Sequence, residues 1–182
     1  MRSLLSMITL ALLTVLPVRG EDIDSLQIYV QAGDSCMQEF NTFEALLNYQ
    51  RAYDLSQALE VRLKLADCHY KRADYHQTAK LLKNIPEDSL SHEAFRQLTF
   101  SYQKQGDNDS FMYWAEQLIY RYPMDSEVVA GLTLAFAKAN QPQRGIVCGM
   151  RYSQRDSANI MVNRALADAW FMNRDFTAAG KL

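Results

Sequence analysis

Apolar residues recur along the chain in short stripes with helical spacing, and the stripes themselves repeat every 33 or 34 residues. Spacings of three and four place side chains on one face of an α-helix, and the alternation typical of strands is absent. A period of this length indicates a repeat protein built from helix pairs. The clearest members of the stripes are Leu98 with Tyr102, Leu132 with Phe136, and Leu166 with Trp170.

Alignment of the stripes predicts five units, which begin near residues 26, 57–59, 91–92, 125–126 and 160. A short polar turn divides each unit into two helices. Gly106 and Asn140 stand where a left-handed residue ends the first helix, and Pro142 stands where a second helix begins. The chain is therefore predicted to be an all-α array of helical hairpins.

The first unit matches the pattern only weakly, because Ala32-Gly33-Cys36 takes the place of a large residue, a small residue and an aromatic one. Its second helix keeps the helical spacing through Ala45, Tyr49 and Ala52. Terminal repeats are often irregular, so this segment is counted as a repeat.

Three aspartates that are each followed by serine, Asp24, Asp88 and Asp156, stand near the predicted starts of first helices. Asp and Ser favour the N-cap position, and capping is the preferred interpretation. The alternative is that these Asp-Ser pairs are acceptors for O-linked sugars, which they resemble.

The segment with Leu98, Tyr102, Gly106 and Pro123 carries the resemblance to a known family. From about Leu26 to its end the chain resembles the tetratricopeptide repeat family, which implies an α-solenoid of antiparallel helix pairs wound into a right-handed superhelix. The domain is predicted to span residues 21–182, with about five repeats of which the last is incomplete. The Tyr-Pro-x-x-Ser ending at residues 122–126 resembles repeats of bacterial cell-envelope proteins.

Two departures from the family pattern lead to packing predictions. In the third unit Phe111 stands where a small residue is expected and Ala115 where a large one is expected, which predicts a compensated core without a void. In the fourth unit Gly145 and Gly149 lie four apart on one helical face, and Trp170 is predicted to fill the groove that they leave.

The family resemblance also implies a partner-binding groove on the inner wall, formed by the first helices. Its mixture of rings and cations suits an extended peptide or an amphipathic helix. The alternative is that these rings pack against neighbouring repeats. The predicted inner wall consists of Tyr70, Lys71, Arg96, Phe100, Lys104, Leu134, Lys138, Arg164, Asp168 and Phe171.

Residues 1–20 read as a secretory signal peptide, because Arg2 precedes a 13-residue apolar run from Leu4 to Leu16 and a break follows before Glu21. A membrane-spanning helix needs about 20 apolar residues, so an uncleaved anchor is the weaker alternative. The mature protein is predicted to be exported, either periplasmic or secreted, and to have no membrane span after cleavage.

The charge pattern argues against nucleic acid as a partner. Loss of Arg2 and Arg19 with the signal leaves 17 basic and 21 acidic residues, and no cluster of Lys and Arg remains. Binding to a phosphate backbone requires such a cluster.

Motifs for catalysis are lacking: there is no phosphate loop, no His-Glu-x-x-His and no nucleophile elbow. Cys68 and His69 are adjacent, and adjacent helical residues diverge by about 100°, so they are poorly placed to share one metal ion. His69 is instead expected in the core, at the position of Tyr102 one repeat later. The chain is predicted to be no enzyme and to hold no cofactor or metal.

Three cysteines, Cys36, Cys68 and Cys148, fall in predicted helices. Three thiols packed in the core are favoured over a disulfide between Cys36 and Cys68.

The predicted function is that of an exported scaffold for protein–protein interaction in the assembly of a bacterial envelope complex, with a protein or peptide segment as partner. The alternatives are the N-terminal interaction region of a longer signalling protein or enzyme, and a structural spacer. Residues 177–182 match only the first turn of a second helix, which predicts either a longer chain or self-association through the incomplete last repeat.

Overall fold

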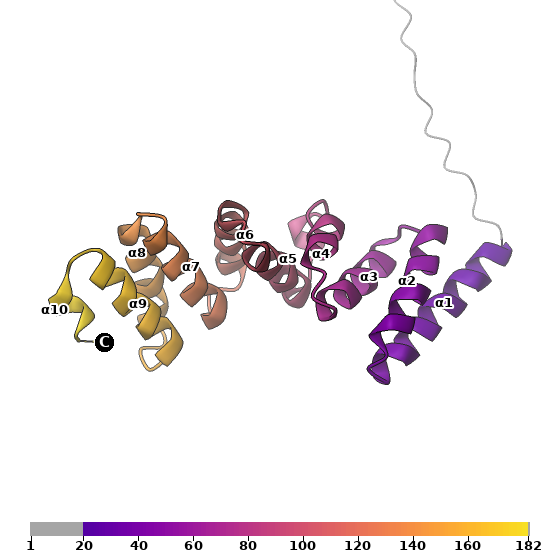
Figure 1. The fold of residues 1–182 in the computed structure, drawn as a ribbon, viewed down its shortest axis with the longest axis horizontal. Helices are drawn as coiled ribbons and strands as arrows, with labels where there is room; N and C mark the ends of the chain where they lie inside the picture. Colours follow the sequence, from indigo (N-terminus) through magenta and orange to yellow (C-terminus); the bar gives the residue numbers. More distant parts are fainter. Residues whose placement is uncertain (1–19, 182) are drawn as a thin grey trace, which may run out of the picture.

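The computed structural model describes residues 20–181, with side chains described from Asp24 onward. The predicted signal peptide therefore lies outside the described residues except for Gly20. Figure 1 shows the helices following one another along an elongated molecule, from α1 at one end to α10 at the other. The elements are α1 (Gly20–Gln38), α2 (Thr42–Leu55), α3 (Leu59–Lys71), α4 (Tyr75–Leu82), the short 3-10 helix η1 (Glu87–Ser89), α5 (His92–Gln105), α6 (Asn108–Arg121), α7 (Ser126–Lys138), α8 (Pro142–Ser153), α9 (Ile160–Met172) and α10 (Phe176–Ala179).

The helices form five successive pairs, and the predicted all-α solenoid is confirmed. Four of the five first helices begin at or within one residue of the predicted starts, at Leu59, His92, Ser126 and Ile160. The exception is α1, which begins at Gly20 and not near Leu26. First helices of neighbouring pairs also pack directly on each other, α3 on α5 and α7 on α9.

Each pair turns through one left-handed residue, and these residues recur with the period of the repeat. Gly106 (φ 77°) and Asn140 (φ 61°) hold this conformation as predicted. Phe40, Ala73 and Arg174 adopt it too, with φ of 58°, 60° and 63°. An ordinary side chain in this region costs about 1–2 kcal/mol, so the hairpin geometry overrides the local preference at these three turns.

The residue after each left-handed position caps the second helix. Asn41, Asp74, Asp107 and Asp175 each accept a hydrogen bond from the backbone N–H three residues later. In the fourth pair no side chain caps α8, which begins instead with Pro142, as predicted. Proline suits the first helical position because its missing N–H would be unpaired there anyway.

The prediction that Asp24, Asp88 and Asp156 cap first helices is wrong. Asp24 lies inside α1, and Asp88 belongs to η1. Asp156 accepts a hydrogen bond from the Ala158 N–H in the turn before α9. The caps of α5 and α9, Ser91 and Asn159, lie three residues after Asp88 and Asp156, because η1 and the turn separate each Asp from its helix. Asp125 caps α7.

Phe111 and Ala115, the large and small residues that are exchanged in the third unit, pack in the core as predicted. Phe111 is 1% exposed and Ala115 is 0% exposed. Gly131 of α7 supplies the compensation, because a Cβ atom there would lie 3.2 Å from Cζ of Phe111. The large residue on α6 is accommodated by a missing side chain on α7.

Gly33 explains the weak pattern of the first unit. A Cβ at this position would lie 2.5 Å from Cε1 of Tyr49. The Tyr49 ring is buried against the α1 backbone, and its hydroxyl donates a hydrogen bond of 2.7 Å to Asp34. A glycine therefore stands at the small position of the pattern because the ring from α2 leaves no room for a side chain.

The prediction that Trp170 fills the groove at Gly145 and Gly149 is wrong. A Cβ on Gly145 would lie 2.4 Å from the Thr133 carbonyl oxygen, so α8 approaches the α7 backbone too closely for any indole. Gly149 faces Leu166, at 3.1 Å from Cδ1. Trp170 lies one turn further along α9 and packs beside Leu166.

All three cysteines are free thiols, as predicted. Cys68 is fully buried, its Sγ lies 3.4 Å from the Thr42 carbonyl oxygen, and burial raises the pKa of its thiol to about 11. His69 is mostly buried at 13% exposure, as expected, and lies 3.1 Å from Asp74; burial lowers the pKa of its ring.

Candidate functional site

The predicted inner wall lies on the four first helices α3, α5, α7 and α9, but much of it already has partners within the chain. Lys71 pairs with Asp67 at 2.8 Å. Tyr70 is half-buried and packs edge-on against Tyr75, with ring centroids 5.6 Å apart. Phe100 is only 6% exposed. These side chains serve the packing of the array, which was the alternative interpretation of the rings.

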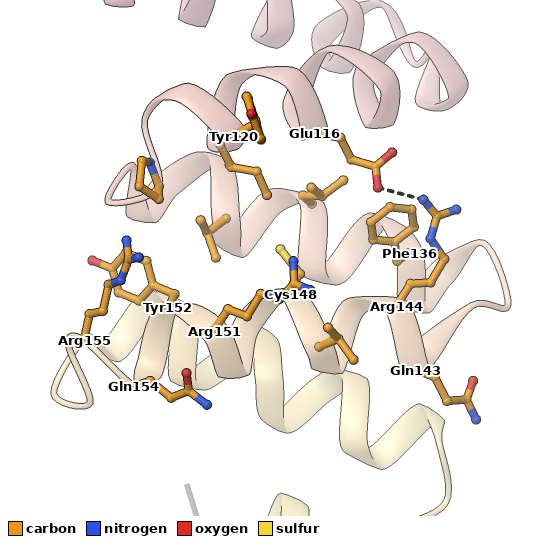
Figure 2. Close-up of a pocket in the computed structure, with 15 residues that line it drawn as sticks. Glu116, Tyr120, Phe136, Gln143, Arg144, Cys148, Arg151, Tyr152, Gln154 and Arg155 are labelled. Carbon is orange, nitrogen blue, oxygen red and sulfur yellow. Dashed lines mark hydrogen bonds and ion pairs between the residues drawn. The ribbon is translucent and has the colours of Figure 1, made fainter.

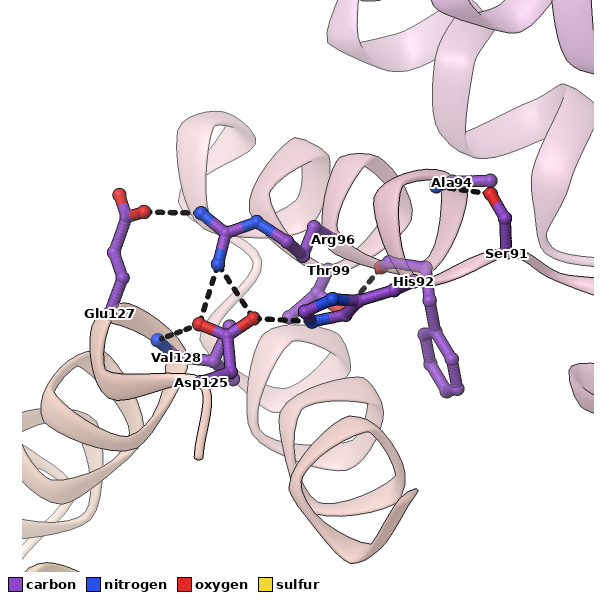
Figure 3. Close-up of polar contacts among 9 residues, drawn as sticks. Ser91, His92, Ala94, Arg96, Thr99, Asp125, Glu127 and Val128 are labelled. Carbon is purple, nitrogen blue, oxygen red and sulfur yellow. Dashed lines mark hydrogen bonds and ion pairs between the residues drawn. The ribbon is translucent and has the colours of Figure 1, made fainter. Parts of the chain in front are cut away.

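Arg96 is the most heavily engaged residue of the predicted inner wall (Figure 3). Its guanidinium donates to both carboxylate oxygens of Asp125, at 2.5 and 2.6 Å, and also pairs with Glu127. It lies over the Phe100 ring, 5.1 Å from the centroid. Arg96 thus joins α5 to the N-terminus of α7.

Asp125 is the centre of this network, and its side chain is 2% exposed. It caps α7 through the Val128 N–H and lies 2.8 Å from Nε2 of His92. Burial by itself would raise the pKa of Asp125, but the hydrogen bonds from Arg96, Val128 and His92 outweigh it and hold the pKa below its usual value. One carboxylate therefore both caps a helix and holds two repeats together.

The remaining members of the predicted inner wall are dispersed. Leu134 is half-buried, while Phe171 is 63% exposed and packs edge-on against Phe176. None of the ten residues lines the cavities described below. The exposed polar members are Lys104, Lys138, Arg164 and Asp168.

A cavity of about 710 Å³ lies instead on another face, between α6 and α8 and above α7 (Figure 2). We call it the α6–α8 cleft. Each helix contributes a stripe of residues spaced three or four apart, so the cleft runs along the helices. It is lined by Glu116, Ile119, Tyr120, Pro123, Val129, Leu132, Phe136, Gln143, Arg144, Val147, Cys148, Arg151, Tyr152, Gln154 and Arg155.

The cleft and the predicted inner wall occupy opposite sides of α7. Leu132 and Phe136 line the cleft. Leu134 and Lys138 each follow one of them by two positions, which turns a side chain by about 200° around the helix axis. A residue set chosen from the first helices alone would miss this surface.

The α6–α8 cleft has a counterpart one repeat later. A cavity of about 580 Å³ lies between α8 and α10 above α9. Met150, Leu166 and Trp170 line it, each 34 positions after Glu116, Leu132 and Phe136 of the first cleft. Both cavities are thus one feature of the repeat, formed where two second helices flank a first helix.

At the corresponding place one repeat earlier, two large side chains meet. Trp114 stands 34 positions before Cys148 and packs edge-on against Phe95, with ring centroids 5.9 Å apart. Phe95 stands 34 positions before Val129. The smaller Cys148 and Val129 line the α6–α8 cleft. These two replacements remove aromatic bulk from the floor and leave the cleft open.

The cleft is electropositive, with three arginines and one glutamate among its lining residues. Arg144 pairs with Glu116 at 2.7 Å and lies over the Phe136 ring at 4.1 Å (Figure 2). Arg151 and Arg155 are exposed and form no ion pair with any residue between 24 and 181.

The floor of the cleft stays uncharged. Val129 and Leu132 are 2% and 0% exposed, so they offer the cleft only a small apolar area each. Burial is the main cause of the raised pKa of the Cys148 thiol. The arrangement combines an apolar floor with unpaired cations at the rim, which is typical of a recognition site.

The sequence contains one signal that could have found this site. In the 34-residue alignment, Trp114 and Phe95 of the third unit become Cys148 and Val129 in the fourth. A simultaneous loss of two aromatic rings at adjoining positions indicates an emptied space. Arg151 and Arg155 give a weaker signal, because exposed arginines on a helix are common.

The described residues contain no group of three or more His, Cys, Asp or Glu placed to hold a metal ion. None of the helices between residues 20 and 181 is long and apolar enough to cross a membrane.

Comparison with known proteins rests on structure, since no family model and no curated protein matches the sequence. A crystal structure of MamA superposes with a TM-score of 0.77 at 16% identity, covering 87% of each chain. YrrB, described as a TPR protein with an unusual peptide-binding site, gives 0.75 at 10% identity over 88% of this chain and 84% of its own. A tetratricopeptide repeat protein from Parabacteroides merdae gives 0.72 at 8% identity over 87% and 64%. At these identities the likeness establishes the fold.

Proposed function

We propose that this chain, which has the tetratricopeptide-repeat fold, is an exported, non-enzymatic scaffold that holds a segment of a partner protein in the α6–α8 cleft. By doing so it organises a protein complex of the bacterial cell envelope. The self-association predicted from the sequence is a separate question that this proposal does not require.

One observation carries the proposal: Cys148 occupies the place of Trp114, and a cavity of about 710 Å³ is left between α6 and α8. Pockets that bind small ligands or anchoring side chains measure about 300–1,000 Å³. The walls are helices that pack on α7. A partner segment would therefore lose its own freedom on binding, while the scaffold would lose little.

The choice of this cleft over the predicted inner wall follows from the pairing of charges. Arg96 and Lys71 of the inner wall already have carboxylate partners in the chain. Arg151 and Arg155 of the cleft have none among the described side chains. A ligand that bound Arg96 or Lys71 would have to displace these ion pairs, whereas a ligand that bound Arg151 or Arg155 would not.

Site-specific photo-crosslinking tests the proposal in cells that produce the protein. A benzoylphenylalanine at Tyr120, which is 90% exposed at the rim of the cleft, should yield a discrete crosslinked partner. The same probe at Lys104 on the predicted inner wall is the matched control. The Cys148→Trp variant should abolish the Tyr120 product, because the indole refills the cleft. Equal crosslinking with and without this substitution would rule the cleft out.

Export rests on the apolar run from Leu4 to Leu16 and the break before Glu21. N-terminal sequencing of the protein recovered from the periplasm or medium tests it, with Glu21 expected as the first residue. Recovery of the intact Met1 N-terminus from the cytoplasm would contradict this part of the proposal.

A further inference from the structure

On the basis of the proposed function, we infer that the partner segment is an acidic peptide with at least one large apolar side chain. Its carboxylates pair with Arg151 and Arg155, and its apolar side chain enters the cleft above Val129 and Cys148. The inference depends on the charges of the cleft, the positions of its arginines and its shape, each of which restricts the class of occupant.

The charges of the cleft favour an anionic occupant. Among the lining residues only Glu116 is acidic, and it is paired with Arg144. Arg151 and Arg155 are left to attract a partner. In the chain as a whole acidic residues exceed basic ones, so this local excess of arginine stands out against an acidic background. Complementary charge contributes above all to specificity and to the rate of association.

The positions of the arginines set where the carboxylates bind. Arg151 lies in the last turn of α8, and Arg155 lies in the turn that follows, two residues beyond Ser153, where the helix ends. Both side chains line the same cleft. The inference therefore predicts at least two acidic residues close together in the partner segment.

The shape of the cleft requires an apolar group between the charges. The floor is formed by buried Val129, Leu132 and half-buried Cys148, and Val147 and Tyr120 stand at the rim with 50% and 90% of their surface exposed. Covering such a surface with a Leu, Phe or Trp side chain removes apolar area from water and so strengthens binding. An acidic segment without a large apolar residue would leave this surface exposed to water.

These features distinguish a peptide from other anions. A nucleic acid would need a run of cations along its backbone, and the cleft offers two free arginines above an apolar floor. A membrane surface would need a protruding basic face, whereas these arginines flank a concave cavity (Figure 2).

Selection from a displayed library of random 12-residue peptides on the purified protein tests the inference. The expected peptides carry two or more Asp or Glu close to a Leu, Phe or Trp. The selected peptides are then synthesised, and their affinities are measured for the wild type and three variants. Folding of each variant is checked by its thermal unfolding curve.

The variants test separately where the peptide binds and which class of peptide binds. Cys148→Trp should abolish binding. The double variant Arg151→Glu/Arg155→Glu should weaken binding about tenfold or more, since each rim pair contributes a few tenths to 1 kcal/mol and reversal adds repulsion. The matched double variant Lys138→Glu/Arg164→Glu has the same change in net charge on the other face and should change affinity less than about twofold.

The results that would overturn the inference differ from those that would overturn the proposed function. Peptides that depend on Cys148 but are basic, or insensitive to the arginine reversal, would overturn the acidic class and leave the cleft as the site. Peptides that bind Cys148→Trp as tightly as the wild type, or no enriched peptides at all, would overturn both. A wild-type dimer that Cys148→Trp converts to monomer would show a second copy in the cleft and overturn the acidic partner.

Discussion

Cys148 of α8 stands 34 residues after Trp114 of α6, and the two occupy the same place in successive repeats. Trp114 meets Phe95 on the floor of its own repeat, whereas Cys148 leaves an open cavity. Two positions thus distinguish the third repeat, where a smaller cavity of about 490 Å³ remains beside Trp114, from the fourth, where the cavity measures about 710 Å³.

The reverse substitution should enlarge the cavity beside Trp114 at a cost in stability. Trp114→Cys removes a ring that packs against buried Phe95, and loss of a buried Trp destabilises by about 3–5 kcal/mol when it is fully enclosed. Trp114 is half-buried, so about 2–3 kcal/mol is expected in the free energy of unfolding, measured by urea denaturation. Tyr113→Cys is the matched control, because its side chain is 53% exposed; equal losses in the two variants would contradict the assignment.

Gly145→Ala should destabilise the fourth repeat although alanine favours helices. The new Cβ would lie 2.4 Å from the Thr133 carbonyl oxygen, and this backbone atom can move only if the two helices separate. A loss of about 2 kcal/mol is expected after the gain of about 1 kcal/mol in helix propensity.

The matched control is Gly149→Ala in the same helix. Its Cβ would lie 3.1 Å from Cδ1 of Leu166, the end of a flexible side chain. The unfolding free energy should stay within about 1 kcal/mol of the wild type, because the propensity gain offsets the contact. Equal destabilisation in both variants would show that the approach of α8 to Thr133 is not the limiting contact.

Asp125 should make the stability of the array depend on acidic pH. Because the pKa of Asp125 is lower in the folded protein than its usual 3.8, its contribution is fully present above about pH 4 to 5. It is lost as the pH falls through the folded pKa. Asp125→Asn keeps a capping side chain but removes the charge, and should cost about 2–4 kcal/mol at pH 7.

The decisive comparison is the slope of unfolding free energy against pH. The Asp125→Asn variant should lose less stability than the wild type between pH 5 and pH 3. Parallel slopes for the two proteins would mean that the pKa of Asp125 is the same in the folded and unfolded states.

Cys68 should resist alkylation in the native protein. Burial raises its pKa to about 11, so little thiolate exists at pH 8, and its side chain is fully enclosed. Native protein treated with iodoacetamide should be labelled at half-buried Cys36 before Cys68, and all three thiols should react in urea. Mass spectrometry of the peptides measures this; labelling of native Cys68 as fast as Cys36 would contradict its burial.

The fold could be predicted because the large core residues recur with the period of the repeat. Leu98, Leu132 and Leu166 are each at most 2% exposed, and each lies near the middle of a first helix. The turns were harder to predict. Phe40 and Arg174 adopt a conformation that the pattern of local preferences assigns to Gly or Asn, because the packing of the two helices fixes the turn between them.

The candidate site could not be predicted in the same way. The inner wall follows from the family resemblance alone, and the sequence gives no indication that Arg96 pairs with Asp125, 29 residues away. Nor does it reveal that the Gly145 backbone excludes Trp170 from the groove. Such contacts depend on how closely two helices approach, which helical spacing within one helix does not determine.

We propose that the partner binds between α6 and α8 and not on the predicted inner wall. Isothermal titration of one selected peptide, or of the crosslinked partner, into the wild type, Cys148→Trp and Lys104→Glu distinguishes the two surfaces. We expect no measurable binding by folded Cys148→Trp and wild-type affinity for Lys104→Glu. The opposite result, binding retained by Cys148→Trp and lost by Lys104→Glu, would contradict it.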